Sequence, residues 1–209
     1  MKDDLRPTVA AQLTGGLVRM QEDAARAKPH ALALRAALRL GVRGSFGANA
    51  RADAALLGVV RVPVDDDGQP PPFDARLGRL LDDASLVAGL VAATRVRVYT
   101  PVTPHGAPSA RSRRSLGRDL RTIKARRPTA SDDLLTAMLR AGREQLPRHL
   151  RRALSLMADD GAGVDVYALV MDLDHWDADD HWVQKRWAYH FWSQLEARDR
   201  NTDQQEETA

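Results

Sequence analysis

The sequence contains no cysteine, and this absence excludes several kinds of chemistry at once. Disulfide bonds, thiolate nucleophiles and zinc sites built with cysteine all need a residue that the chain lacks. The first residues, MKDDLRPTVAAQLTGG, show no apolar stretch after a basic one, as a signal peptide would. No segment approaches the roughly 20 apolar residues of a membrane span. We therefore expect a cytoplasmic protein that is neither exported nor associated with a membrane.

Lysine is scarce, with 4 residues against 27 arginines, and the charges are unevenly distributed. Residues 1–94 carry 12 basic and 11 acidic side chains, residues 95–158 carry 15 and 4, and residues 159–209 carry 4 and 13. The net charges are therefore +1, +11 and −9. A central segment of this sign suits a polyanionic partner, because each cation that neutralises a phosphate releases counterions. A solvated charged face and the arginine bias of a GC-rich genome are the alternative explanations.

The sequence also lacks any long alternation of apolar and polar residues, which a half-buried strand would need. Apolar residues instead recur at helical spacing, so we predict an all-α fold. Three prolines and many basic residues interrupt this pattern in residues 95–114, which we interpret as a connector that has room for one short strand, RVRVY. The prediction is two small helical lobes, residues 1–94 and 115–198, with a disordered tail at residues 199–209.

The clearest helix signals follow the connector. Leu116, Leu120 and Ile123 share one helical face. The next helix is expected to open at Thr129, with a capping box to Asp132, and to end at Gly142. A third runs over residues 143–157, and a helical hairpin lies within residues 163–199, its first arm beginning after Asp165 as its N-cap. Three tryptophans in the second arm of the hairpin are expected to pack in the core, with base stacking as the alternative.

Basic side chains occupy the helical faces that the apolar residues leave open. Arg114, Arg118 and Arg121 repeat at helical spacing, so they lie about 5–6 Å apart, close to the spacing of successive phosphates. The third helix buries its leucines and exposes its arginines. The predicted phosphate-binding residues of this central segment are Arg111, Arg113, Arg114, Arg118, Arg121, Lys124, Arg140, Arg143, Arg148, Arg151 and Arg152.

The acidic segment DLDHWDADDH, residues 172–181, raises the alternative of a metal-dependent nuclease. Metal ligands must converge, and His175 and His181 lie six residues apart, roughly 120° around a continuous helix. The turn of the hairpin expected near Asp177 leaves the geometry of this pair open. No HExxH motif is present, and the EF-hand template fails because Trp176 and Asp177 occupy its third ligand position and its glycine position. We therefore predict no metal site, no cofactor and no catalytic residue. A stand-alone helical DNA-binding regulator is a more distant alternative.

The chain resembles a known family through four motifs in a fixed order. These are SLGRDL at residues 115–120, LLTAMLRAGREQLPRHLRRALSLM at 134–157, VDVYALVMDLDHW at 164–176 and RWAYHFW at 186–192. Together they are similar to the CasB family, the small subunit of the type I-E CRISPR Cascade complex. The resemblance covers about residues 112–195, and in the N-terminal half it includes only RAALRLG and the overall size.

The resemblance implies an all-helical, non-enzymatic protein with partners of several kinds. These are the other Cascade subunits, CRISPR RNA, and target DNA as a single strand or an R-loop, with two copies of the protein in each complex. Arg118, Arg140, Arg143, Arg151 and Arg152 match basic positions of the family motifs, and Arg39 matches more loosely. The chain departs from many relatives at Asp132 and Asp133, where they carry an arginine pair.

Overall fold

The structure is a computed structural model, and it describes residues 5–43, 46–62, 69, 71–99 and 114–193. Helices dominate this part of the chain, so the predicted all-α class is confirmed. Its helical elements are α1 (Leu5–Ala25), α2 (Pro29–Leu38), the 3₁₀ turn η1 (Arg39–Arg43), α3 (Ala50–Val59), α4 (Ala75–Thr94), α5 (Leu116–Lys124), α6 (Pro128–Arg140), α7 (Leu146–Asp159), α8 (Val166–Asp174) and α9 (Trp182–Trp192).

Side-chain caps and prolines set where these helices begin. The Asp165 carboxylate accepts a 3.0 Å hydrogen bond from the Ala168 amide, so the predicted N-cap of α8 is confirmed. The predicted cap at Thr129 is wrong, because α6 begins one residue earlier at Pro128 and its N-cap residue, Arg127, makes no capping side-chain bond. Pro147 likewise lies in the first turn of α7, which starts at Leu146 rather than at residue 143. Proline suits a first helical turn because it has no N–H to donate.

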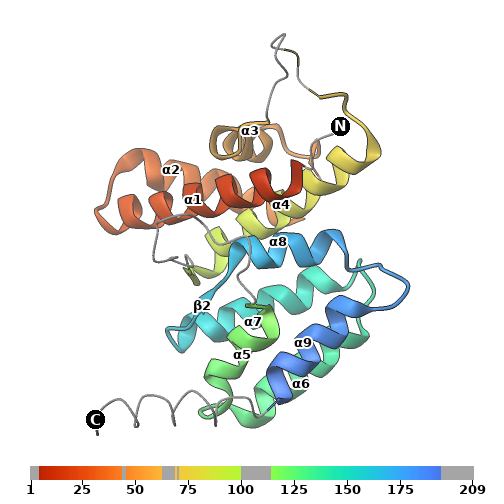
Figure 1. Cartoon of the computed structure of the whole chain (residues 1–209). Helices are drawn as coiled ribbons and strands as arrows, with labels where there is room; N and C mark the ends of the chain where they lie inside the picture. The colour runs from red at the N-terminus through yellow and green to blue at the C-terminus, as the bar shows by residue number, and fades with distance from the viewer. Residues whose placement is uncertain (1–4, 44–45, 63–68, 70, 100–113, 194–209) are drawn as a thin grey trace, which may run out of the picture.

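The helices form two layers that share α8 as their junction. In Figure 1, α1 to α4 make the upper layer and α5, α6, α7 and α9 the lower one, with α8 directly below α1 and α4. α8 packs against both α1 and α4, and α4 also packs against α7. The buried apolar side chains accordingly form one continuous cluster that runs from Val9 to Phe191. The predicted domain boundaries at residues 94 and 115 stay a prediction.

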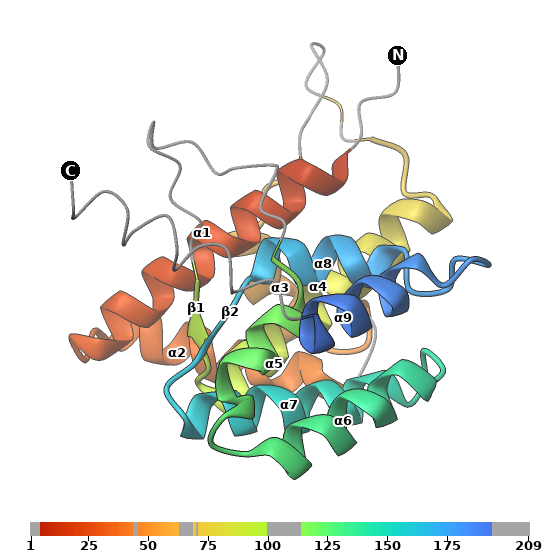
Figure 2. The same cartoon turned by 60° about the horizontal axis from the view of Figure 1, so that its bottom comes forward.

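Two short strands also join the layers. β1 (Arg97–Val98) follows α4, β2 (Gly163–Val164) precedes α8, and the two pair in parallel (Figure 2). The short strand expected within RVRVY is therefore confirmed. The rest of the predicted connector, residues 100–113, and the predicted disordered tail lie outside the residues that the structure describes.

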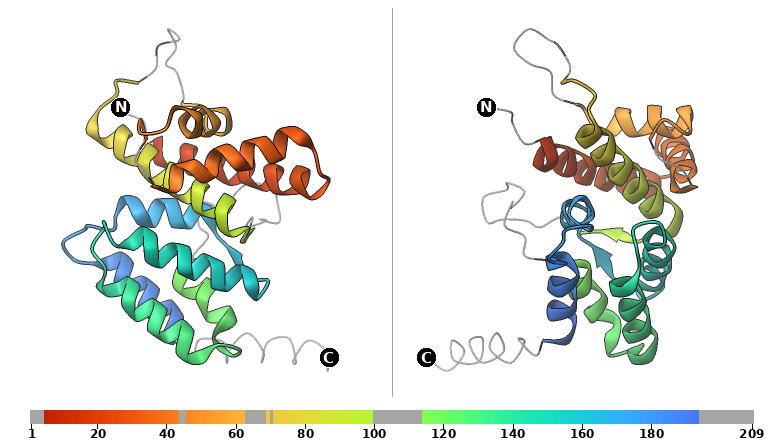
Figure 3. Two further views of the ribbon diagram at one scale, coloured as in Figure 1. Left: turned by 180° about the vertical axis from the view of Figure 1, so that it is seen from behind. Right: turned by 90° about the vertical axis from the view of Figure 1, so that its right-hand side faces the viewer.

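The last helix departs from the expected hairpin. α9 packs mainly along α5 rather than back along α8, and Figure 3 shows α9 and α7 on opposite sides of the lower layer. The Trp176 and Trp187 rings are both buried, with their centroids 5.0 Å apart, as core packing predicts. Trp192 is 45% exposed, however, so the prediction of core packing is wrong for this tryptophan. No described helix is both long and apolar enough to cross a bilayer.

Candidate nucleic-acid interface

The α7 helix carries the most regular row of exposed cations. Leu146, Leu150, Leu154 and Met157 are at most 1% exposed and turn one face of the helix into the core. Arg148, Arg151 and Arg152 are exposed on the opposite face. Residues three or four apart on a helix lie about 5–6 Å from each other, a spacing that matches neighbouring phosphates. These three arginines, the α7 row, form a surface that can follow a sugar–phosphate backbone.

The basic residues of α5 lie beside the end of α9. Leu116, Leu120 and Ile123 are buried, as predicted, and this orientation leaves Arg118 exposed. Burial, Arg186 and Arg118 together lower the pKa of His190 on α9. Two further cations, Arg121 and Lys124, also contact residues at this end of α9.

Arg121 donates a hydrogen bond to the backbone carbonyl of Ser193, the C-cap residue of α9. The Lys124 Nζ lies 2.9 Å from an Asp132 carboxylate oxygen and 4.6 Å from the centre of the Phe191 ring. Asp132, one of the two residues that depart from the family pattern, thus already pairs with a predicted phosphate-binding cation. Arg118, Arg121 and Lys124 are called the α5 cations below.

Arg114 makes its contacts inside the protein. Its Nε donates a 2.9 Å hydrogen bond to Asp119, which is fully buried, and its guanidinium lies 4.0 Å from the centre of the Tyr99 ring. Asp119 also accepts a 3.0 Å bond from the Asp165 amide, although burial still raises its pKa. Arg114 therefore compensates a buried carboxylate between β1, α5 and α8, a role that its sequence spacing did not reveal.

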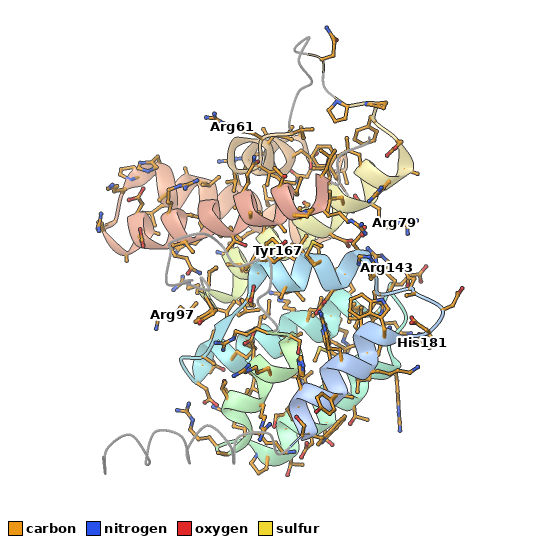
Figure 4. The ribbon with its side chains drawn as sticks, in the orientation of Figure 1. Arg61, Arg79, Arg97, Arg143, Tyr167 and His181 are labelled. Carbon is orange, nitrogen blue, oxygen red and sulfur yellow. The ribbon has the colours of Figure 1, made fainter. Side chains whose placement is uncertain are left out.

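Arg143 is also engaged within the protein. It donates hydrogen bonds to the Leu173 carbonyl at 2.7 Å, to the Asp83 carboxylate and, at 3.5 Å, to Asp177. These contacts tie the connection between α6 and α7 to α4 and α8. In Figure 4, Arg143 and Arg79 lie at the same edge of the molecule, where the two layers meet. Both residues line a cleft of about 410 Å³.

Asp83, the α4 partner of Arg143, was not singled out from the sequence. Its side chain is 5% exposed, and one of its carboxylate oxygens has no hydrogen-bond partner within the described structure. Burial raises the pKa of Asp83 to about 6, although the positive charge of Arg143 opposes the rise. No local signal marks this aspartate, because only the packing of α4 against the lower layer brings Arg143 to it.

The pKa of Asp83 predicts how stability changes with pH. The folded state holds the proton more tightly than the unfolded chain, so this group contributes stability at low pH that is lost as pH rises through about 6. One pKa unit corresponds to about 1.4 kcal/mol, so the loss from this group amounts to about 2 to 3 kcal/mol. Urea unfolding from pH 4 to pH 7 should show a decline in the parent protein that is smaller in Asp83→Asn. Equal declines in the two proteins would contradict this assignment.

The remaining predicted site residues fall into two groups. Arg140, at the end of α6, and Arg39, in η1, are exposed. Arg111 and Arg113 lie outside the residues that the structure describes. Two basic residues that the sequence prediction omitted, Arg126 and Arg127, contact Asp160 after α7, with Arg127 forming a 3.1 Å ion pair. Their position within the basic run at residues 111–127 is the only sequence signal that points to them.

The acidic segment that motivated the nuclease alternative is used largely for packing. Asp172 is fully buried and accepts hydrogen bonds from the Trp187 indole at 2.6 Å and from Arg186. His175 contacts Arg6 at 2.9 Å through Nε2 and the Met171 carbonyl at 2.9 Å through Nδ1. Within the described part of the chain, no three histidine or acidic side chains are grouped as a metal ion would need.

The fold and this surface together define the class of the protein, which is an all-α protein that exposes a row of arginines on one helix. The chain belongs to the family of the CRISPR-associated protein Cse2, whose family model matches residues 7–192. The family resemblance predicted from the sequence motifs is thereby confirmed.

Solved structures of the same fold include two CasB proteins and a larger assembly. CasB from Thermus thermophilus is 24% identical, with a TM-score of 0.59 over 88% of this chain and 97% of that one. CasB from M. ruber is 24% identical, with a TM-score of 0.58 over 91% and 97%. A chain of a CRISPR RNA-guided surveillance complex is 23% identical, with a TM-score of 0.58 over 92% and 99%. No curated protein sequence matches the chain significantly.

Proposed function

We propose that this protein is a non-catalytic, nucleic-acid-binding subunit of a type I-E CRISPR RNA-guided surveillance complex in the cytoplasm. It contacts target DNA and stabilises the displaced strand of the R-loop. Its partners are the other Cascade subunits, CRISPR RNA and target DNA, and each complex holds two copies. Family membership and the similarity to a chain of such a complex support this proposal.

The observation that carries the DNA-binding part of the proposal is the exposed α7 row. Arg148, Arg151 and Arg152 project from a helix whose other face is held in the core, so their spacing is preset before a strand binds. Guanidinium groups bind phosphate oxygens in a fixed fork geometry, and phosphate contacts position a protein without reading sequence. The guide RNA, rather than this protein, would then select the target.

Salt dependence tests this proposal directly. The exposed candidates on α5, α6 and α7 are Arg118, Arg140, Arg148, Arg151 and Arg152. If these five cations each neutralise one phosphate of a single strand, log affinity should fall against log salt with a slope of roughly −3.5, at about 0.7 per phosphate. Fluorescence anisotropy with unrelated labelled DNA oligonucleotides measures the slope, and sequence should change the affinity little.

The same preparation separates this function from the nuclease alternative. Incubation of the protein with DNA or RNA, with and without a divalent metal, should leave the nucleic acid intact. A salt-independent affinity, or a strong preference for one sequence, would overturn phosphate-based binding. Metal-dependent cleavage that disappears in His175→Ala would instead favour the nuclease.

A further inference from the structure

The last residue that the structure describes, Ser193, lies next to the α5 cations. The carbonyl of Ser193, the residue after α9, accepts a hydrogen bond from Arg121. Lys124 lies 4.6 Å from the centre of the Phe191 ring, so two of the α5 cations contact the end of α9, and Arg118 is close enough for its charge to contribute to the lowered pKa of His190. Ser193, the last residue that the structure describes, therefore lies beside this group of positive charges.

The residues that follow Ser193 have the opposite charge. Residues 194–209 contain five acidic and two basic side chains. Both basic residues come early, at Arg198 and Arg200, so the stretch 201–209 holds Asp203, Glu206 and Glu207 without a single cation. The end of the sequence is thus a short polyanion attached next to a basic surface.

The acidic residues are within reach of that surface. Asp203 lies ten residues after Ser193, and ten extended residues span up to about 33–36 Å. The nine residues of α5 occupy about 13 Å at 1.5 Å per residue. A chain of this length can therefore bring its carboxylates along the whole of α5. A segment attached this close is also present at a high effective concentration, on the order of millimolar.

An acidic side chain already occupies one of these cations. Asp132 lies 2.9 Å from Lys124 and accepts a 3.1 Å hydrogen bond from the Trp192 indole, so it holds a carboxylate at the edge of the same surface. This contact shows that a carboxylate can reach Lys124. It also leaves Arg118, which is exposed, as the cation most open to a further anion.

We propose that residues 201–209 bind the α5 cations within the same molecule and compete there with nucleic acid. The competition rests on the proposed function, because it regulates the nucleic-acid binding proposed above. The contact between residues 201–209 and α5 does not depend on that function. A free chain would then bind DNA weakly through α5, and a phosphate backbone of sufficient charge would displace the acidic segment. The α7 row lies on a different helix and would stay available throughout.

The contact itself can be tested without nucleic acid. Because the chain has no cysteine, Thr208→Cys provides a single attachment site for a nitroxide spin label. We expect the label to broaden the backbone amide resonances of Arg118 to Lys124 at 50 mM salt, and much less those of Arg148 to Arg152. The broadening should disappear at 1 M salt, and also in a chain with Asp203→Asn, Glu206→Gln and Glu207→Gln. Equal broadening on both helices, or none, would overturn the contact.

The competition is tested by affinity for single-stranded DNA. Neutralising Asp203, Glu206 and Glu207 should raise the affinity roughly tenfold at 50 mM salt and by less than about twofold at 0.5 M, because the competing attraction is screened. The matched control is Asp65→Asn, Asp66→Asn and Asp67→Asn, which changes the net charge equally in a different segment.

The outcomes distinguish the two proposals. An equal gain in the two neutralised chains would overturn competition by residues 201–209 and leave DNA binding intact. Spin-label broadening without any measurable DNA affinity would overturn the proposed function and leave the intramolecular contact intact. Broadening together with a tenfold gain confined to the variant of residues 203, 206 and 207 would support both.

Discussion

Replacing Arg148, Arg151 and Arg152 with glutamine should lower the affinity for single-stranded DNA about 100-fold at 0.1 M salt. The physical reason is counterion release. Three phosphate contacts contribute about 2 to the slope of log affinity against log salt. Their contribution to the affinity therefore grows about 100-fold as the salt concentration falls from 1 M to 0.1 M. The slope itself should flatten from roughly −3.5 to about −1.4. All three side chains are exposed, so the fold should be unaffected.

A matched variant tests whether position or total charge is responsible. Arg26, Arg51 and Arg61 are exposed on or beside the upper layer, and their replacement with glutamine removes the same charge. Anisotropy titrations of both variants should show the large loss only for the α7 row. In the assembled complex, the α7 variant should lose R-loop formation on target DNA while guide RNA loading is retained. Comparable losses in both variants would show that only net charge matters.

Gly117→Ala should destabilise the protein by at least about 3 kcal/mol. Gly117 lies in the first turn of α5, where α9 approaches so closely that an added Cβ would meet the Trp187 carbonyl, with its carbon 2.7 Å and the Trp187 Cα 2.8 Å away. Alanine normally stabilises a helix by about 0.5–1 kcal/mol relative to glycine. The clash is with backbone atoms, which cannot rotate aside, so the expected change has the opposite sign and a larger size.

Gly142→Ala provides the control for this substitution. Gly142 follows α6, and apart from its own and its neighbours' atoms no heavy atom of the described residues lies within 4 Å of the position that its Cβ would take. Its replacement should leave stability within about 1 kcal/mol of the parent protein, or raise it slightly. Urea unfolding followed by circular dichroism measures both variants. Similar midpoints for Gly117→Ala and the parent protein would show that α5 and α9 can separate without cost.

Two of the predicted phosphate-binding arginines are held by carboxylates inside the protein. Arg114 and Arg143 belong to the basic run and to a family motif, respectively, yet their guanidinium groups contact Asp119 and Asp83 inside the protein. A buried carboxylate left without its cation is costly, so substitution of either arginine would disturb packing as well as any phosphate contact. The three arginines of α7 carry no such ambiguity and are the better residues for testing DNA binding.

The sequence by itself determined the helical class, the family and the faces of α5 and α7. These follow from local periodicity, because residues three and four apart share a helical face wherever the helix packs. Leu120 and Leu150 are therefore buried, while Arg118 and Arg151 are exposed, as their spacing predicts. The cap at Asp165 is equally local, since its bond to Ala168 spans three residues.

Only the tertiary structure decided which cations remain available to a partner. Arg143 and Asp83 are 60 residues apart in sequence, and Arg121 meets the Ser193 carbonyl across 72 residues. The placement of α9 along α5 also depended on Gly117, whose missing side chain permits the close approach. Such pairings depend on which helices come together and at what distance. Helical periodicity carries no information about either, because it describes each helix relative to its own axis alone.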